Sequence, residues 1–274
     1  MKNDLIELKQ QYRKAAQQIP ADSFFKQSLD HKFRHSLEVL RQGQYILHHT
    51  PELADKDNVF GDLAQKALLF HDVGRFAEAA LRCNAARNGT GLDSLVAAYN
   101  HGKIGYELLQ NLPPYNDMRI LFAIRWHGEM MQDILASSMY QNIKNSPQFD
   151  DIMLILKLVR DADKLANLQV IKQQDHLRQD LFYKQLAPEV INADISPKVK
   201  AGFLAKEVVL SADLKSFADR ILQIISWIYD LNYQTSKEVF KQQQYGSFLL
   251  DMLKKYHHDL KDIEEIATCL RQAF

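Results

Sequence analysis

Apolar residues recur every three to four positions over most of the chain, which is the period of an amphipathic helix. This pattern predicts one helix from Asp4 to Gln18 and a second from Asp30 to His49. The second is expected to end before Thr50-Pro51, because the residue that precedes a proline is pushed out of the α region. A third helix is expected to have Asp62 as its N-cap and to run to His71, before Val73-Gly74.

Three further helices are predicted in the middle of the chain, at 99–111, 117–127 and 150–171. Arg87–Gly91 is the one Gly-rich loop. The rest of the chain is expected to be helical, with breaks near Pro188, Pro197 and the Asn232–Gln234 segment. Since no segment has the convincing alternation of a strand, the predicted fold class is all-α.

Composition agrees with long helices and few turns. Only 10 of the 274 residues are glycine and 7 are proline, whereas the many turns of sheet-rich folds need both. A polar stretch follows the 150–171 helix and is the expected internal boundary. We therefore predict an N-terminal helix at 1–29, a core at 30–171, and a helical extension at 172–274 that packs on the core.

Charge and cysteine content make several function classes unfavourable. Lys and Arg together number 34, and Asp and Glu together also number 34. This balance argues against a protein that mainly coats nucleic acid or an anionic membrane. Cys83 and Cys269 cannot form a disulfide framework. The first residues carry charges where a signal peptide needs an apolar segment, and no apolar stretch approaches the ~20 residues that span a bilayer. We expect a cytoplasmic protein without a membrane partner.

Histidines are the candidate chemistry. Four of the ten lie on apolar faces of four different predicted helices: His35, His71, His101 and His127. Burial of four imidazoles and of the adjacent Asp72 is unfavourable unless each group is hydrogen-bonded or bound to an ion. One such histidine alone is more often a hydrogen-bonded core residue. A shared metal would satisfy all of them together, since imidazole and carboxylate suit Mn, Fe, Co, Ni and Zn.

Carboxylates complete the candidate set. Asp72 directly follows His71, and adjacent helical residues point about 100° apart, so at a helix end the two can reach one ion from two sides. Two oxygens also allow Asp72 to bridge two ions, as two-metal hydrolytic sites require. The 150–171 helix is apolar almost all round and carries Asp161 and Asp163. Its periodicity leaves the choice between these two open.

The order of these residues and their flanking sequences resemble the HD-domain superfamily of metal-dependent phosphohydrolases. The matching positions of its H…HD…H…H…D signature are His35, His71-Asp72, His101, His127 and Asp163. Residues 68–76, LLFHDVGRF, are similar to the LLHDIGRF segment of an uncharacterised HD subgroup, and residues 162–167, ADKLAN, resemble its ADRLHN element. The resemblance implies an HD helical bundle with additional C-terminal helices, and it selects Asp163 over Asp161.

The resemblance also implies roles for the signature residues. One divalent ion would be held by His35, His71, Asp72 and Asp163. His101 and His127 would bind a second ion that Asp72 bridges, or would contact the substrate phosphate. Asp72, His101 and His127 are therefore the candidate catalytic residues. The expected cofactor is one or two divalent ions of Mn, Fe, Co, Ni, Zn or Mg.

The candidate phosphate-binding residues are Arg75, Lys103 and Lys164, each of which lies within three residues of an expected ligand. We expect them to hold the non-bridging oxygens of a phosphate, because charge-assisted hydrogen bonds to phosphate are strong. Solvated surface charges are the competing interpretation for each. The implied partner is a small phosphorylated substrate such as a nucleotide, and nucleic acid is not expected as a partner.

The function predicted from these features is that of a metal-dependent phosphohydrolase. It would act as a phosphomonoesterase or phosphodiesterase on a nucleotide or another small phosphate ester, through a metal-activated water. An HD-fold di-iron oxygenase would use the same six ligands. A nucleotide-sensing module without catalysis would have little need for all six, and a bundle with coincidental histidines would hold no stoichiometric metal. The neighbouring cations favour the phosphohydrolase.

Overall fold

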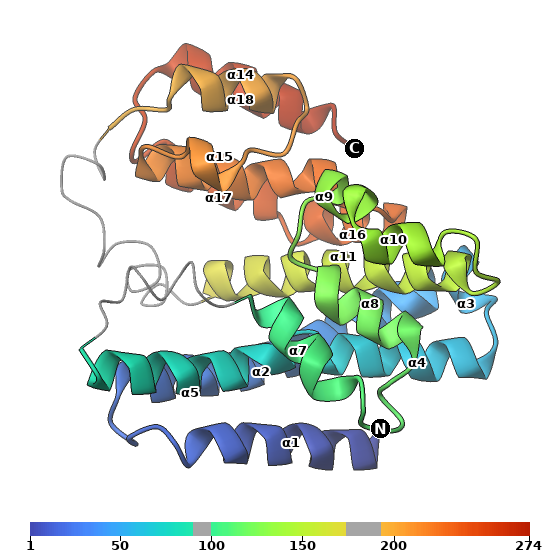
Figure 1. The fold of residues 1–274 in the computed structure, drawn as a ribbon. Helices are drawn as coiled ribbons and strands as arrows, with labels where there is room; N and C mark the ends of the chain where they lie inside the picture. The colour runs from blue at the N-terminus through green and yellow to red at the C-terminus, as the bar shows by residue number, and fades with distance from the viewer. Residues whose placement is uncertain (90–99, 174–192) are drawn as a thin grey trace. The chain divides into compact units, whose positions relative to one another are not determined.

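The computed structural model describes residues 1–89, 100–173 and 193–274, and these residues form helices and no strand (Figure 1). The prediction of an all-α fold is confirmed. The chain forms two compact units, Met1–Asp163 and Lys164–Phe274. The boundary between their residue ranges falls within helix α11 (Phe149–Gln173), and the predicted division at 171/172 falls near the C-terminal end of the same helix.

The first unit holds the segment of α11 up to Asp163 and nine further described helices: α1 (Lys2–Ala16), α2 (Phe24–His49), α3 (Pro51–Ala54), α4 (Asn58–Phe70), α5 (Val73–Arg87), α7 (His101–Leu109), α8 (Met118–Trp126), α9 (Met131–Ala136) and α10 (Ser138–Ile143). Helix α5 packs on α1, α2 and α7, while α4 packs on α2 and α8. Helices α1, α2 and α5 run side by side in Figure 1. Helix α7 packs in turn on α8, so these helices form one continuous core.

Helix α2 begins before its predicted start at Asp30. Ser23 is its N-cap, and the Ser23 hydroxyl accepts a hydrogen bond from the backbone nitrogen of Lys26. This bond satisfies one of the amide donors that a helix start leaves unpaired, so the helix can begin at Phe24. The predicted end at His49 is confirmed.

Helix α4 begins at Asn58, so the prediction of Asp62 as its N-cap was wrong. Asp57 has that role, because its carboxylate accepts a hydrogen bond from the backbone nitrogen of Phe60 over 2.8 Å. Asp62 lies one turn further on and forms an ion pair with Lys66 on the same helix. Both aspartates precede apolar residues, and the capping preference alone does not separate them.

Helix α5 starts at Val73, where the sequence analysis placed a break. His71 is the C-cap of α4 and Asp72 is the N-cap of α5, so the chain turns from one helix into the next at this dipeptide. Gly74 is a packing position: a Cβ atom there would lie 2.0 Å from the backbone oxygen of His101. The absence of a side chain lets α5 and α7 approach closely.

Helices α7 and α8 approach each other by the same means. A Cβ atom on Gly102 would lie 2.5 Å from the backbone oxygen of Arg125. Asn100 begins α7 by accepting a hydrogen bond from the backbone nitrogen of Lys103. The two close helix contacts place the His71-Asp72 turn, the first residue of α7 and the last turn of α8 within reach of one another.

The remaining predictions for the first unit are largely confirmed. The 117–127 and 150–171 helices correspond to α8 and α11, and the 99–111 helix corresponds to α7, although its residue 99 lies outside the described residues. The end of the Arg87–Gly91 loop and the break near Pro188 also lie outside them. Helices α9 and α10 were not predicted, and each adds one isoleucine to an apolar cluster with α8 and α11: Phe122, Ile134, Ile143, Ile152 and Leu156.

The second unit contains the remainder of α11 and the following described elements: α14 (Pro197–Leu204), η1 (Ser211–Asp213), α15 (Phe217–Ser226), η2 (Trp227–Asp230), α16 (Gln234–Gln242), α17 (Tyr245–Leu253) and α18 (Leu260–Arg271). Helix α15 is buried between α14 and α17, and α18 packs on both of these. The Tyr245 hydroxyl donates to Gln169 over 2.6 Å and links α17 to the end of α11. The predicted breaks near Pro197 and Gln234 are confirmed as helix starts.

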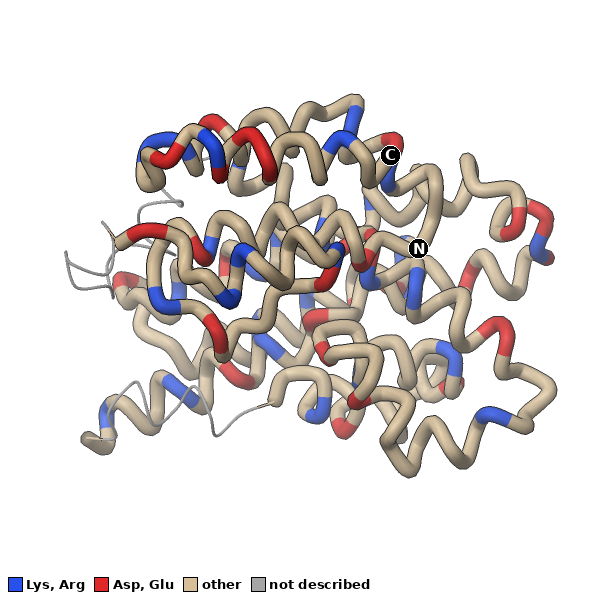
Figure 2. Tube along the Cα trace, turned by 90° about the horizontal axis from the view of Figure 1, so that it is seen from above, with Lys and Arg blue, Asp and Glu red and all other residues tan. Residues whose placement is uncertain are grey.

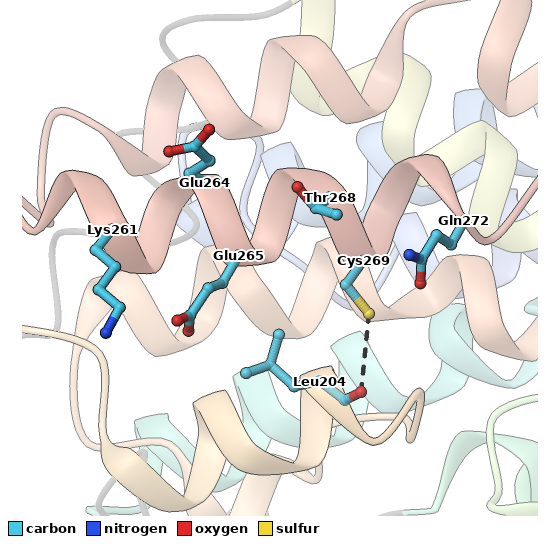
Figure 3. A pocket seen from close by; sticks show the side chains of 7 residues that line it. All are labelled: Leu204, Lys261, Glu264, Glu265, Thr268, Cys269 and Gln272. Atoms are coloured by element: carbon cyan, nitrogen blue, oxygen red, sulfur yellow. Dashed lines mark hydrogen bonds between the residues drawn. The ribbon is translucent and has the colours of Figure 1, made fainter.

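The second unit contains a buried polar cluster and a pocket. His257 is buried between two carboxylates, with its Nδ1 3.1 Å from Asp194 and its Nε2 3.2 Å from Asp262. A pocket of about 540 Å³ lies along α18, and Figure 3 shows its lining side chains together with the contact between Cys269 and the backbone oxygen of Leu204. None of the lining residues is one of the predicted ligands.

Charged residues of both signs are interspersed along the helices (Figure 2). This distribution agrees with the zero formal net charge of the sequence. Within residues 1–89, 100–173 and 193–274, no helix combines the length and the apolar composition that a membrane crossing requires.

Candidate metal centre

All six predicted ligands come together in the first unit, and we refer to them as the His–Asp centre: His35, His71, Asp72, His101, His127 and Asp163. Two of them, His35 and Asp163, lie within the long helices α2 and α11. The other four lie at helix ends, where backbone direction changes. Most of the centre is buried, and the side chains of His101 and Asp163 are the most exposed, at 18% and 23%.

One half of the centre gathers around Asp163. His35 Nε2 lies 2.8 Å from Asp163 Oδ1, and His71 Nε2 lies 3.7 Å from the same oxygen. Asp72 Oδ2 is 3.7 Å from His71 Nε2 and 4.0 Å from His35 Nε2. An ion about 2.0–2.2 Å from each ligand atom holds those atoms roughly 3–4.4 Å apart. His35, His71 and Asp72 each offer a ligand atom within 4.8 Å of the other two and could hold a divalent ion, and Asp163 contacts both histidines of this group.

The other half uses the second oxygen of Asp72. Its Oδ1 lies 3.5 Å from His101 Nε2 and 3.6 Å from His127 Nε2. The two imidazole nitrogens are 3.3 Å apart. Asp72 therefore directs one oxygen at each pair of histidines. Two groups of three side chains could each hold an ion: His35, His71 and Asp72 in one, and Asp72, His101 and His127 in the other.

Backbone carbonyls orient two of the imidazoles. His71 Nδ1 donates to the carbonyl of Leu68 over 2.9 Å, and His127 Nδ1 donates to the carbonyl of Ile124 over 3.0 Å. With the proton on Nδ1, the lone pair of Nε2 faces the centre. His71 Nε2 is buried and has no hydrogen-bond partner among the residues that the structure describes. A buried lone pair without a donor is unfavourable by itself and fits a bound cation.

The electrostatic environment favours the ligating forms of these groups. Burial lowers the pKa of His71 to about 4 and that of His101 to about 2, although the charge of Asp72 opposes both shifts. Burial would raise the pKa of Asp72, but Lys32 and the surrounding histidines hold it well below its usual range. At neutral pH His71 and His101 are thus neutral and Asp72 is ionised, which are the forms that bind metals.

His35 and Asp163 form the tightest pair in the centre. Burial would raise the pKa of Asp163, but the hydrogen bond from His35 and the nearby imidazoles lower it. The ionised carboxylate can only accept, so His35 Nε2 carries the proton in this arrangement, and an ion would replace that proton. Of the two carboxylates that helical periodicity left open, Asp163 is the one whose oxygen contacts His35 and His71.

Arg75 lies beside the centre, as predicted. Its Nε is 3.7 Å from Asp72 Oδ1, and its Nη1 donates to Glu78 over 2.8 Å. Glu78 is buried and also accepts a hydrogen bond from Arg82. Burial would lower the pKa of Arg75, but Asp72 and Glu78 raise it, so the guanidinium is a fixed positive charge.

Lys32 is a second cation at the centre, and it was not among the residues predicted from the sequence. Its Nζ lies 3.1 Å from Asp72 Oδ2. Lys32 precedes His35 by three residues on α2, a spacing that places two side chains on the same helix face. That spacing is a signal in the sequence that could have found it.

The other two predicted phosphate-binding residues have different surroundings. The Lys103 side chain is 67% exposed, and its ammonium lies 3.9 Å from Glu107. The Lys164 ammonium lies 2.8 Å from Asp230. A role in phosphate binding stays a prediction for both lysines.

Arg160 stabilises the backbone next to the centre, and it too was not predicted from the sequence. It is buried on α11, and its Nη1 donates to the backbone oxygens of His127 and Glu129. These bonds fix the turn that follows α8 and carries His127. Arg160 precedes Asp163 by three residues, so one face of α11 supplies a predicted ligand and a support for another.

Comparison with known families agrees with this geometry. The family known as the HD domain matches residues 33–168 of the chain, a range that contains the whole His–Asp centre. The chain belongs to the HD-domain superfamily. HD domains bind divalent metals, and most members of the superfamily are metal-dependent hydrolases. Neither a curated protein nor a solved structure matches the chain. The predictions of family and fold class are thereby confirmed, and His–Asp groups able to hold a metal are present.

Proposed function

We propose that this HD domain is a metal-dependent phosphohydrolase with two divalent ions, and that its substrate is a small phosphate ester such as a nucleotide. The position of Asp72 carries the proposal. Each of its oxygens faces a different pair of histidines, at 3.7 and 4.0 Å on one side and 3.5 and 3.6 Å on the other. A carboxylate shared between two ion positions is the arrangement that two-metal hydrolytic sites use.

Different residues of the chain have different roles in the proposed reaction. Bound divalent ions would lower the pKa of a water molecule and polarise the phosphoryl oxygen. His35, His71 and Asp163 would hold one ion, His101 and His127 would hold the other, and Asp72 would contribute to both positions. The carbonyls that fix His71 and His127 keep these imidazoles aimed at the centre without reorganisation. His101 and Asp163 form the partly exposed side on which a substrate enters.

A di-iron oxygenase is the main alternative, since it would use the same ligands. The cations beside Asp72 favour phosphate chemistry over it. Lys32 and Arg75 place two positive charges within 4 Å of the shared carboxylate, and a substrate without negative charge would leave them uncompensated once ions bind. A nucleotide-sensing module without catalysis is less favoured because binding alone does not need two complete ion positions.

The partner class follows from the same charge pattern. The zero net charge and the interspersion of both charge signs along the helices (Figure 2) agree with a small phosphorylated substrate better than with nucleic acid or a membrane. A cytoplasmic location is part of the proposal.

Elemental analysis of the purified chain, paired with a panel of phosphomonoesters and phosphodiesters with and without added Mn or Co, tests the function. We expect about two ions per chain and turnover that His71→Ala and Asp72→Ala each abolish. Turnover that survives both substitutions would contradict the mechanism. Two irons per chain without phosphate-ester turnover would replace it with the oxygenase, and stoichiometric nucleotide binding without turnover would replace it with the sensing module.

A further inference from the structure

Two cations flank the shared carboxylate of the His–Asp centre, one on each oxygen. Lys32 Nζ lies 3.1 Å from Asp72 Oδ2, and Arg75 Nε lies 3.7 Å from Asp72 Oδ1. They come from different helices, α2 and α5. Both side chains are partly exposed, at 25% for Lys32 and 31% for Arg75.

The two cations already balance the carboxylates of the centre. Asp72 and Asp163 contribute two negative charges, and Lys32 and Arg75 contribute two positive charges. Glu78, which holds Arg75, is balanced by Arg82. These two pairs of opposite charges are equal in number, so every divalent ion that binds would add positive charge beyond this balance. The loaded site is consequently an anion-binding site, with a preference for the more highly charged anion.

The side chains of the two cations differ in conformational freedom. Arg75 is held by Glu78 over 2.8 Å, so its guanidinium is preorganised. Lys32 carries its ammonium on a flexible four-carbon stem, and its contact with Asp72 competes with an ion for the same oxygen. A divalent ion bound by Asp72 would repel the ammonium of Lys32, which could then turn to an anion bound beside the ion.

We propose that Lys32, together with Arg75, binds the non-bridging oxygens of a terminal phosphate, and that the substrate is a phosphomonoester. A monoester dianion has three non-bridging oxygens and two charges, enough to engage the ions and both cations together. A diester has two such oxygens and one charge, and would leave a cation unpaired. This inference rests on the proposed function and assigns Lys32 a role in substrate binding.

Binding of inorganic phosphate to the Mn-loaded protein at pH 8, measured by calorimetry, tests Lys32 directly. We expect Lys32→Met to weaken phosphate binding by about 10- to 100-fold, since a charge-assisted hydrogen bond is lost. Lys32→Arg should retain affinity within about fivefold, because it keeps the charge. Arg34→Met is the matched control: Arg34 is exposed on the same helix, its loss removes the same charge, and its effect should stay within about twofold. Dimethyl phosphate, a diester anion, should bind the wild type at least about tenfold more weakly than phosphate.

Metal content measured on the same samples separates the possible failures. Unchanged Mn content in Lys32→Met with weakened phosphate binding supports the assignment. Wild-type affinity for phosphate in Lys32→Met would overturn it, as would loss of Mn, which would make Lys32 a support of the ligands. Equal affinity for phosphate and dimethyl phosphate would overturn the monoester preference. All of these outcomes leave the hydrolase proposal standing, whereas a wild type without metal or ester turnover would refute that proposal itself.

Discussion

Arg160 Nη1 donates a hydrogen bond to the backbone oxygen of His127 over 3.0 Å. The bond joins α11, which carries the predicted ligand Asp163, to the turn after α8, which carries the predicted ligand His127. The two halves of the His–Asp centre are thus held at a fixed separation by a residue that is not itself a ligand.

Replacement of Arg160 should therefore loosen one ion position. We expect Arg160→Met to leave the carbonyls of His127 and Glu129 without their donor and to destabilise the protein by about 2–4 kcal/mol. Metal content should fall from about two ions per chain toward one, as measured by elemental analysis. Arg160→Lys retains a charge and a donor and should recover part of both losses. Full metal content in Arg160→Met would show that His127 does not depend on this support.

Helical periodicity was sufficient to predict most of the long helices, because their apolar faces are wide and their ends are marked. Pro51 fixes the end of α2, and α11 is apolar over most of its circumference. Helix α5 was missed because Gly74 was interpreted as a break. Its actual role is a contact with the backbone of His101, and such a contact exists only in three dimensions.

The candidate site was likewise predictable from the sequence only in part. The six members of the His–Asp centre could be identified because their residue types and flanking motifs resemble a family signature. Lys32 and Arg160 carry no such signature, and their partners lie 40 and 33 residues away in the chain. Nothing in the local sequence states which partners α2 and α11 will meet, so these contacts depend on tertiary packing.

Asp72→Asn should affect both ion positions at once. The variant keeps the shape of the side chain but removes its charge and one acceptor oxygen, so the two groups of ligands lose their common member. We expect elemental analysis to find well under one ion per chain and ester turnover to fall by more than about a hundredfold. His101→Ala is the comparison: it removes a ligand from one group only and should retain about one ion. Equal metal loss in the two variants would contradict the bridging position of Asp72.

Gly74→Ala tests the close contact of α5 with α7. Its Cβ atom would lie 2.0 Å from the backbone oxygen of His101, so α7 would have to shift and carry that imidazole with it. We expect a destabilisation of about 2–4 kcal/mol and a loss of metal from the half of the centre that contains His101. Gly61→Ala is the matched control, because Gly61 lies inside α4 and an added Cβ would meet nothing within 4 Å. That variant should be more stable by roughly 0.5–1 kcal/mol. A Gly74→Ala protein as stable as the wild type in thermal unfolding would refute the packing role.

The folding stability of the second unit should depend on pH through the carboxyl group of Asp262. Its carboxylate pairs with Lys200 and lies 3.2 Å from His257. The hydrogen bond from Lys200 lowers the pKa of Asp262 against the opposing effect of burial. A carboxyl whose pKa is lower in the folded state stabilises the protein above its unfolded pKa, about 3.9, and this stabilisation is lost as the pH falls through the folded value. Asp262→Asn should therefore be less stable than the wild type at pH 7 and nearly equal to it near pH 3.

The size of this effect is limited because the pair is partly exposed. Both side chains are about one-fifth exposed, so we expect a difference of about 0.5–1 kcal/mol at pH 7, or about 2 °C in the midpoint of thermal unfolding. Asp251→Asn is the control in the same unit, since Asp251 forms only an exposed pair with Lys254. Its midpoint should stay close to that of the wild type at both pH values. A deficit of Asp262→Asn that persists unchanged at pH 3 would mean that the lost stability comes from packing around His257, and the ionised carboxylate would then not be its source.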